Sequence, residues 1–168
     1  MSQEREPFRL GVLTISDAGS RGLREDASGD LICRRMEDQG FRLVLRDLVP
    51  DEGDLIAQRL RHWCDGGQVD LVLTTGGTGL GPRDVTPEAT RSVLDFEVPG
   101  MAEAMRMETL RHTPMAMLSR SVAGVRSGCL VVNLPGSPKA VQETLDVVLP
   151  AIPHALEMIK GWRGHPAH

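Results

Sequence analysis

The sequence predicts an α/β protein: a three-layer sandwich with a mostly parallel sheet and helices on both faces of the sheet. Short apolar runs of strand length alternate along the chain with longer segments whose apolar residues recur at helical spacing. Strands and helices that alternate in this way form βαβ units around a parallel sheet. The chain of 168 residues has the size of one domain, and no repeat or linker divides it. We therefore expect a single domain over residues 1–168, with a core of about 9–161.

The first half of the chain is predicted to hold two strands and two helices. Residues 9–16, RLGVLTIS, are a short apolar run that fits a buried strand. A polar loop follows, and then a helical pattern over 28–39 that Gly40 ends. Residues 41–49, FRLVLRDLV, alternate between apolar and polar side chains as a strand does. The next helix begins near Asp51 and carries apolar residues at helical spacing: Leu55, Ile56, Leu60 and Trp63.

The second half continues the alternation. Two further apolar runs are predicted to be buried strands, VDLVL at 69–73 and LVVNL at 130–134. Helical spacing predicts four more helices, over 87–95, 101–112, 138–149 and 151–160. The last residues, 162–168, are interpreted as a loose tail.

Composition and charge exclude several classes of protein. Hydrophobic residues make up 40% of the chain, and no apolar run approaches the roughly 20 residues that span a bilayer. The amino terminus is charged and has no apolar signal segment, so we expect a cytoplasmic protein without membrane contact. A net charge of −4 gives no support for nucleic-acid binding. Cys33, Cys64 and Cys129 are odd in number and widely spaced, which favours reduced, buried thiols over disulfides or a zinc site.

The segment 74–90, TTGGTGLGPRDVTPEAT, is predicted to hold a phosphate. Its glycines permit positive φ and let backbone N–H groups approach an anion; they are Gly76, Gly77, Gly79 and Gly81. Thr86 makes a good N-cap, and Pro87 suits the first helical position. A helix that begins there would direct its free N–H groups and positive dipole end at the anion.

The amino-acid sequence of this segment excludes two common phosphate-binding loops. The P-loop needs a lysine that is absent, and the dinucleotide-binding pattern needs a glycine where Pro82 stands. A plain strand-to-helix connection is the alternative, but it has no use for four glycines together with Arg83 and Asp84. An arginine suits phosphate oxygens and an aspartate suits a hard cation such as Mg²⁺.

Polar residues follow the predicted strands at the points where the strands end. Ligands of open α/β sheets bind beyond the carboxyl ends of the strands. The residues at these ends are Thr14, Ser16 and Asp17, then Asp51, then the glycine-rich segment, and finally Asn133 with PGSPK at 135–139. We therefore expect them to meet at one edge of the sheet.

The charged residues among them have structural alternatives. Asp51 could serve only as a helix N-cap. Asp84 could have the purely structural role of forming an Asx-turn in the Gly-Pro-Arg-Asp segment. Lys139 could be a solvated lysine. However, a cation at a helix start opposes the helix dipole, and this unfavourable position suits a lysine that binds phosphate. The methionines are interpreted as core residues; they are Met101, Met105, Met107, Met115 and Met117.

Five motifs follow one another in a recognisable order: LTISD (13–17), LVPDE (48–52), the segment 74–90, AMLSRSVAGVR (116–126) and VVNLPGSPKAV (131–141). Together they resemble the molybdopterin adenylyltransferases of molybdenum cofactor biosynthesis, which include the MogA and MoaB type and the amino-terminal domain of gephyrin. The resemblance covers roughly Arg9 to Gly161. It implies the molybdopterin-binding fold and transfer of AMP from Mg²⁺-ATP to the terminal phosphate of molybdopterin, with release of pyrophosphate.

The resemblance also implies roles for individual residues. The aspartates that match Asp51 and Asp84 are catalytic in the family, and we interpret them as Mg²⁺ ligands because a dianionic phosphate needs no strong general base. The expected binding residues for molybdopterin and ATP are Thr14, Ser16, Asp17, Thr75, Gly76, Gly77, Thr78, Gly79, Arg83, Ser119, Arg120, Asn133, Pro135, Gly136, Ser137 and Lys139.

The family further suggests a homotrimer and contacts with other molybdenum cofactor synthesis proteins. The alternative function is a non-catalytic molybdopterin-binding or scaffold protein on the same fold, because a fold alone does not establish a function. The presence of both aspartates argues for the enzyme.

Overall fold

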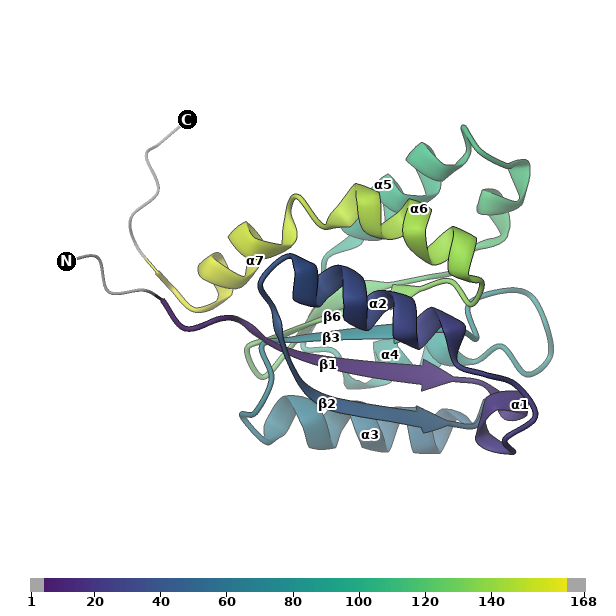
Figure 1. Ribbon diagram of the computed structural model, residues 1–168, viewed down its shortest axis with the longest axis horizontal. Helices are drawn as coiled ribbons and strands as arrows, with labels where there is room; N and C mark the ends of the chain where they lie inside the picture. The colour runs from purple at the N-terminus through teal and green to yellow at the C-terminus, as the bar shows by residue number, and fades with distance from the viewer. Residues whose placement is uncertain (1–4, 163–168) are drawn as a thin grey trace.

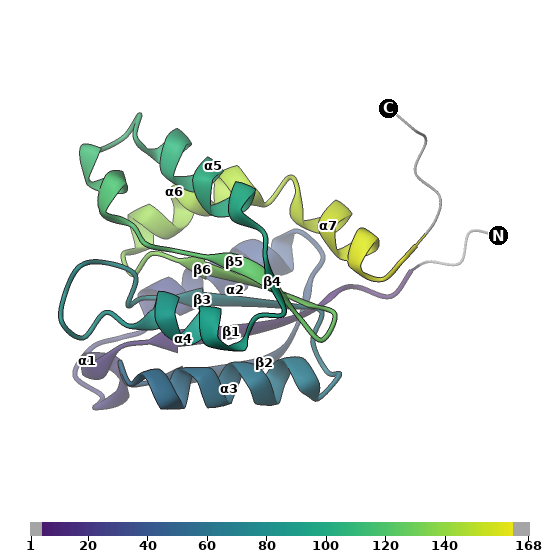
Figure 2. The ribbon, with the colours of Figure 1, turned by 180° about the vertical axis from the view of Figure 1, so that it is seen from behind.

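A six-stranded sheet forms the centre of the molecule, which the computed structural model describes for residues 5–162 (Figure 1, Figure 2). The strands are β1 (Arg9–Ile15), β2 (Arg42–Val49), β3 (Leu71–Thr75), β4 (Phe96–Glu97), β5 (Ala123–Arg126) and β6 (Cys129–Leu134), in the order β2-β1-β3-β6-β5-β4. The first four strands of this order are parallel, whereas β5 pairs antiparallel with both β6 and β4. The predicted mostly parallel sheet is confirmed.

One face of the sheet is covered by four helices, α2 (Ala27–Asp38), α5 (Pro99–Thr109), α6 (Pro138–Val148) and α7 (Ile152–Ile159) (Figure 1). Strand residues such as Leu10, Leu73 and Val132 are fully buried in this layer. They meet the apolar sides of the helices, where Ile32 and Leu145 are likewise fully buried. Removing this apolar surface from water is the main force that holds the helices to the sheet.

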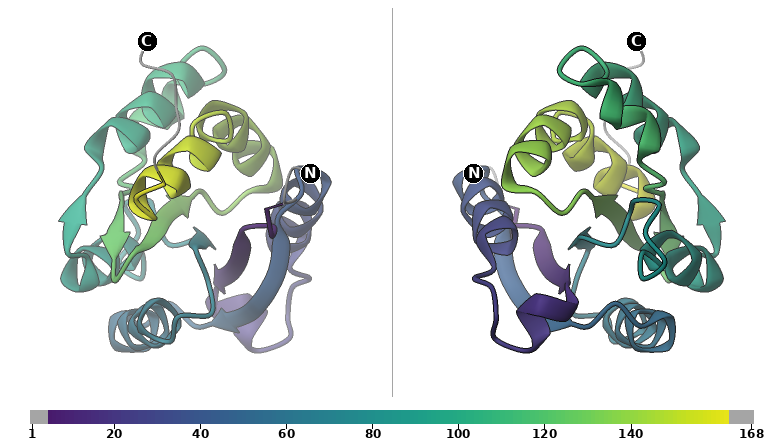
Figure 3. Two further views of the ribbon diagram at one scale, coloured as in Figure 1. Left: turned by 90° about the vertical axis from the view of Figure 1, so that its left-hand side faces the viewer. Right: turned by 90° about the vertical axis from the view of Figure 1, so that its right-hand side faces the viewer.

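The opposite face is covered by α3 (Gly53–Asp65) and α4 (Thr86–Val93). Leu13 and Val72 point to this face because successive side chains of a strand alternate between faces. Gly11 lets the indole of Trp63 lie close against β1, since a Cβ there would come within 3.0 Å of the ring. End-on views place the sheet between the two helical layers, which confirms the three-layer sandwich (Figure 3).

Several element boundaries differ from the predictions. Four short elements were not expected: α1 (Asp17–Ser20), the 3₁₀ helix η1 (Pro114–Leu118), β4 and β5. The strand predicted at 69–73 lies at 71–75, so Thr74 and Thr75 belong to β3 and not to the loop. The helix predicted at 101–112 begins at Pro99 and ends at Thr109. Within residues 5–162, no helix is long and apolar enough to cross a bilayer.

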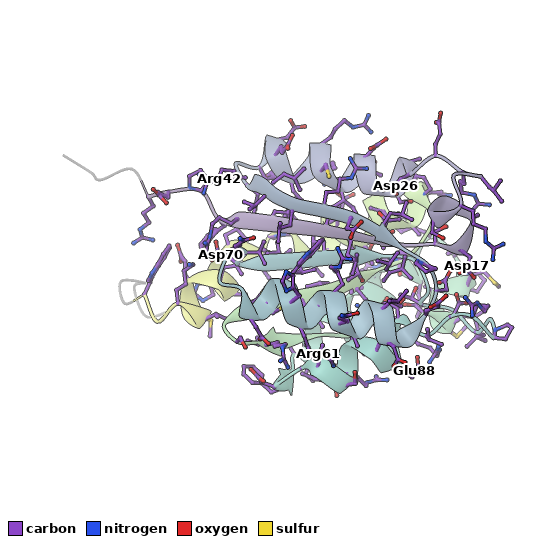
Figure 4. The ribbon with its side chains drawn as sticks, turned by 90° about the horizontal axis from the view of Figure 1, so that it is seen from below. Asp17, Asp26, Arg42, Arg61, Asp70 and Glu88 are labelled. Carbon is purple, nitrogen blue, oxygen red and sulfur yellow. The ribbon has the colours of Figure 1, made fainter. Side chains whose placement is uncertain are left out.

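The two ends of the described chain meet at the amino-terminal edge of the sheet. Trp162 stacks on Phe8 with 5.5 Å between ring centroids, and the Arg5 guanidinium lies 4.9 Å from the Trp162 ring. Trp162 therefore has fixed ring contacts, contrary to the predicted loose tail, although it remains exposed. The remaining residues of the predicted tail, 163–168, lie outside the described part of the chain. Figure 4 shows Asp70 at this end of the molecule and Asp17 at the other.

The predicted burial of the cysteines is confirmed, because Cys33, Cys64 and Cys129 are all buried. The methionine interpretation holds only in part. Met105 is buried and Met101 packs against the core, but three others are exposed: Met107, Met115 and Met117.

Candidate functional site

A pocket of about 390 Å³ opens at the carboxyl ends of the parallel strands. It lies where β1 and β3 meet. The strand order reverses here, because β2 lies on one side of β1 and β3 on the other, and open α/β sheets bind ligands at such a switch point. We call it the switch-point pocket, and the right panel of Figure 3 looks onto this end. It brings together nine of the predicted residues: Thr14, Ser16, Asp51, Thr75, Gly76, Gly77, Asp84, Gly136 and Ser137.

A second pocket of about 440 Å³ lies on the other side of the segment that follows β6. Its lining is mainly apolar and includes Met105, Met115 and Leu118, so we call it the apolar pocket. It holds the predicted residues Thr78, Gly79, Ser119 and Pro135, and Ser137 lines both pockets. Thirteen of the predicted residues therefore divide between two neighbouring pockets, whereas five line neither: Asp17, Arg83, Arg120, Asn133 and Lys139.

The glycine-rich segment makes its sharp turn at two residues. Gly76 has φ 101° and Gly77 has φ 69°, the left-handed region that favours glycine. A Cβ on Gly77 would overlap the Thr86 hydroxyl and lie 3.1 Å from Asp51 Oδ1. Neither Gly79 nor Gly81 has a positive φ, so only the first two glycines have the predicted conformation.

Thr86 holds this turn against α4. Its hydroxyl donates to the Gly76 carbonyl at 2.9 Å, and its N–H donates to the Gly77 carbonyl at 3.1 Å. The predicted N-cap role is wrong: Thr86 is the first helical residue, and Val85 precedes it without a side-chain cap. The Thr86 hydroxyl satisfies the Gly76 carbonyl instead, because Thr86 is fully buried and a buried carbonyl needs a donor.

Asp51 and Asp17 bind each other reciprocally. The Asp17 N–H donates to Asp51 Oδ2 at 2.9 Å, and the Asp51 N–H donates to Asp17 Oδ1 at 3.0 Å. Asp51 is therefore not a helix N-cap, the position that Glu52 takes without a side-chain bond. Burial raises the pKa of Asp51, and the nearby charges of Asp17 and Asp84 raise this pKa further. A carboxylate in this environment gains from a bound cation.

Asp84 combines a local structural bond with a place in the pocket. Its Oδ2 accepts the Gly81 N–H at 2.9 Å, a bond to the residue three positions earlier and so not the predicted Asx-turn, while the residue also lines the switch-point pocket. No group of three or more His, Cys, Asp or Glu within residues 5–162 is arranged to hold a metal. Two carboxylates in one pocket nevertheless suit Mg²⁺, which commonly takes one or two carboxylates, substrate phosphates and water.

The predicted cations do not point freely into the switch-point pocket. The Arg83 guanidinium donates to both oxygens of Asp17, each at 3.0 Å, and these bonds lower the pKa of Asp17. Arg120 binds the carbonyls of Gly79 and Asp84, each at 2.8 Å, and pairs with Glu88.

These contacts give Arg120 a role in fixing the glycine-rich segment. Lys139 lines neither of the two pockets.

Several predicted polar residues are also held by protein groups. The Thr14 hydroxyl donates to Asp26 Oδ2 at 2.8 Å, the Thr75 hydroxyl donates to the Pro135 carbonyl at 2.6 Å, and the Ser16 hydroxyl accepts the Gly19 N–H at 3.0 Å.

Asn133 is fully buried and is bonded to Thr74, Thr90 and Val122, so it joins strands and lines neither pocket. In this structure Asn133 and Arg120 hold neighbouring protein groups in position, and their predicted binding roles remain predictions.

The segment 24–28, which was not predicted from the sequence, forms one wall of the switch-point pocket. Asp26 caps α2 through the Gly29 N–H at 3.0 Å and accepts a bond from Arg46 at 3.1 Å. The Asp-Ala-Ser-Gly sequence at 26–29 carries an N-cap signal that could have placed this helix start, but nothing in the sequence indicates that it borders the pocket.

Comparison with known proteins shows which protein family has this fold and these motifs. The family model described as "Probable molybdopterin binding domain" matches residues 11–154. The molybdopterin adenylyltransferase of Helicobacter pylori strain 26695 is 44% identical over 158 residues, which cover 93% of this chain and 90% of that protein. The molybdopterin adenylyltransferase of Escherichia coli K12 is 39% identical over 92% of this chain and 86% of its own length. The chain belongs to the molybdopterin adenylyltransferase family.

Solved structures of similar proteins share the whole fold. The molybdopterin biosynthesis enzyme MoaB of Thermus thermophilus is 54% identical, with a TM-score of 0.87 over 93% of this chain and 99% of that chain. A MogA structure gives a TM-score of 0.86 at 38% identity, covering 90% of this chain and 99% of that chain. The predicted family, fold class and enzyme class are confirmed.

Proposed function

We propose that this protein acts in molybdenum cofactor biosynthesis by transferring AMP from Mg²⁺-ATP to the terminal phosphate of molybdopterin, with release of pyrophosphate. The observation that carries the proposal is the switch-point pocket, in which Asp51 and Asp84 lie beside the turn at Gly76 and Gly77. Carboxylates and a glycine turn in one pocket suit a metal-bound phosphate, because carboxylates bind the metal and backbone N–H groups bind the phosphate oxygens.

The two pockets give each substrate a place in the proposal. The nucleotide phosphates occupy the switch-point pocket, where the carboxylates lie, and the pterin occupies the apolar pocket beside Ser119 and Pro135. Ser137 lines both pockets, and it caps α6 through the Ala140 N–H at 3.2 Å. The acceptor phosphate would then lie at this shared wall, near the start of α6, whose N–H groups favour an anion.

The chain contributes position and charge to the proposed reaction. The acceptor phosphate is largely dianionic at neutral pH, so no residue has to remove a proton from it. Asp51 and Asp84 would hold Mg²⁺, which would supply charge neutralisation at the ATP phosphates. The reciprocal bonds between Asp17 and Asp51 keep the Asp51 carboxylate at the pocket. Alignment of the two anions supplies the remaining acceleration.

The direct test is to incubate the purified protein with Mg²⁺, ATP and molybdopterin and to follow adenylylated molybdopterin by mass spectrometry. We expect the product and pyrophosphate in equal amounts, and no product when EDTA removes the metal. Molybdopterin that binds without being adenylylated would overturn the proposal in favour of a scaffold protein on the same fold.

A further inference from the structure

The switch-point pocket has an unusual charge balance for a site that receives phosphates. Its lining contains four carboxylates, from Glu25, Asp26, Asp51 and Asp84, and one cationic side chain, that of Arg24. A pocket with this excess of negative charge repels a polyphosphate unless cations compensate it. Mg²⁺ can compensate part of the charge, and Arg24 is the positive side chain that the lining itself offers.

Two neighbouring arginines, Arg83 and Arg46, are already engaged by protein groups. Arg83 is bound to Asp17 through two bonds of 3.0 Å. Arg46 lies within 3.1 Å of Asp26 and 2.6 Å of Asp30. Arg24 is exposed and takes part in none of the ion pairs or side-chain hydrogen bonds found within residues 5–162. Its guanidinium therefore remains available to a ligand.

The segment that carries Arg24 is fixed at both of its ends. Before it, the Leu23 N–H donates to the Ala18 carbonyl at 2.9 Å. After it, Asp26 is bound to Thr14, to Gly29 and to Arg46. Arg24 therefore extends from an anchored loop, and little backbone entropy is lost when it binds an anion.

The helix that follows adds to the same wall. Ala27 and Ser28, in the first turn of the twelve-residue α2, line the pocket beside Arg24. The Gly29 N–H of this first turn donates to the Asp26 carboxylate, but the helix dipole is still positive at this end. An arginine and a helix start on one wall form an arrangement that suits phosphate oxygens.

We propose that Arg24 is a substrate-binding residue that contacts the outer phosphates of the Mg²⁺-bound nucleotide, the part that leaves as pyrophosphate. This inference rests on the proposed function for the identity of the ligand. Phosphate is also present on molybdopterin, but the outer phosphates are favoured because Arg24 shares its pocket with both aspartates assigned to Mg²⁺.

The probe is inorganic pyrophosphate with Mg²⁺, titrated by calorimetry into the wild-type protein and into Arg24→Gln, Arg24→Lys and Arg21→Gln. Arg21 is the matched control, because it is exposed, lies three residues from Arg24 and does not line the pocket. We expect Arg24→Gln to weaken binding about tenfold, as loss of a charge-assisted hydrogen bond does, and Arg24→Lys to restore part of the affinity. Arg21→Gln should change the affinity less than about twofold, since an exposed charge outside the pocket is screened.

Equal effects of Arg24→Gln and Arg21→Gln would overturn the assignment, since only general charge would then matter. A second titration with molybdopterin distinguishes the two sources of phosphate: weakened pterin binding with unchanged pyrophosphate binding would contradict the nucleotide assignment. Failure of the proposed function has a different signature, because the wild-type protein would then form no adenylylated molybdopterin.

Discussion

Asp17 connects three parts of the candidate site through one side chain and one backbone N–H. Its carboxylate binds the Arg83 guanidinium and the Asp51 N–H, and its own N–H binds the Asp51 carboxylate. The loops after β1, β2 and β3 are therefore joined at this residue. Sequence position predicts that such residues gather at the carboxyl ends of strands, but it cannot show that Arg83 is held by an aspartate 66 positions away.

Asp70 provides a test of electrostatics away from the site. Burial alone would raise the pKa of Asp70, but hydrogen bonds from Arg9 and Lys160 lower it to about 2. A lowered pKa contributes stability that is present above the unfolded value of about 4 and is lost as pH falls toward about 2. We expect Asp70→Asn to lower the free energy of unfolding by about 2 kcal/mol at pH 7, and this difference to vanish below pH of about 2.

Denaturant unfolding of wild type and variant across this pH range measures the effect. Asp146→Asn is the control, because Asp146 is 60% exposed in its ion pair with Arg35 and should cost less than about 1 kcal/mol. An Asp70→Asn difference that stays constant between pH 7 and pH 2 would contradict the ion-pair account.

Long elements with a strong pattern were predictable, and short ones were not. The helix predicted over 138–149 lies at Pro138–Val148, because Val141, Leu145 and Val148 mark one apolar face. β4 has only two residues and β5 only four, so their pairing with β6 and with each other decides their conformation more than their own sequence does. The same tertiary effect explains why the strand 71–75 extends into the threonines that were expected to begin the loop.

The turn between β3 and α4 gives the element-scale prediction. Gly77→Ala places a Cβ against the Thr86 hydroxyl and 3.1 Å from Asp51 Oδ1, in addition to the strain of a positive φ. We expect Mg²⁺-pyrophosphate binding to fall by at least about tenfold because the turn and Asp51 must both move. Calorimetry on the folded variant measures this loss.

Gly40→Ala isolates the contribution of backbone strain. Gly40 also has a positive φ, 87°, but nothing lies within 4 Å of an added Cβ. The Gly40→Ala variant should lose about 1 kcal/mol of stability and keep its affinity for Mg²⁺-pyrophosphate. If Gly77→Ala bound pyrophosphate as tightly as Gly40→Ala, the turn would be a connector without a role in binding.

At the scale of the whole molecule, exposed apolar side chains gather near the apolar pocket. Met107 is 68% exposed on α5 and Met117 is 66% exposed on η1. Side chains of this kind are commonly buried when identical subunits associate. We expect a homotrimer in solution at micromolar concentration, and Met117→Glu should shift it toward monomers.

Light scattering measures the mass of each species. Met158→Glu is the control, because Met158 is also 66% exposed but lies on α7. A wild-type monomer, or equal effects of the two substitutions, would show that the surface around Met117 does not mediate assembly.

We infer that Asp51 and Asp84 serve phosphate transfer and not folding. Burial raises the pKa of Asp51, so the folded state disfavours the charged carboxylate. The free energy of unfolding therefore falls as pH rises from the pKa of the unfolded state to the pKa of the folded state. Asp51→Asn removes that charge and should not lower the melting temperature at pH 7. Asp84→Asn keeps an oxygen for the Gly81 N–H and should cost less than about 1 kcal/mol.

The most direct measurement is AMP transfer to molybdopterin by wild type, Asp51→Asn and Asp84→Asn at saturating Mg²⁺, with a thermal melt of each protein. We expect each variant to bind molybdopterin normally, to melt within a few degrees of the wild type and to transfer AMP at least about 10²-fold more slowly. Normal transfer by both variants, or lost transfer together with a large loss of thermal stability, would contradict this role of the two aspartates.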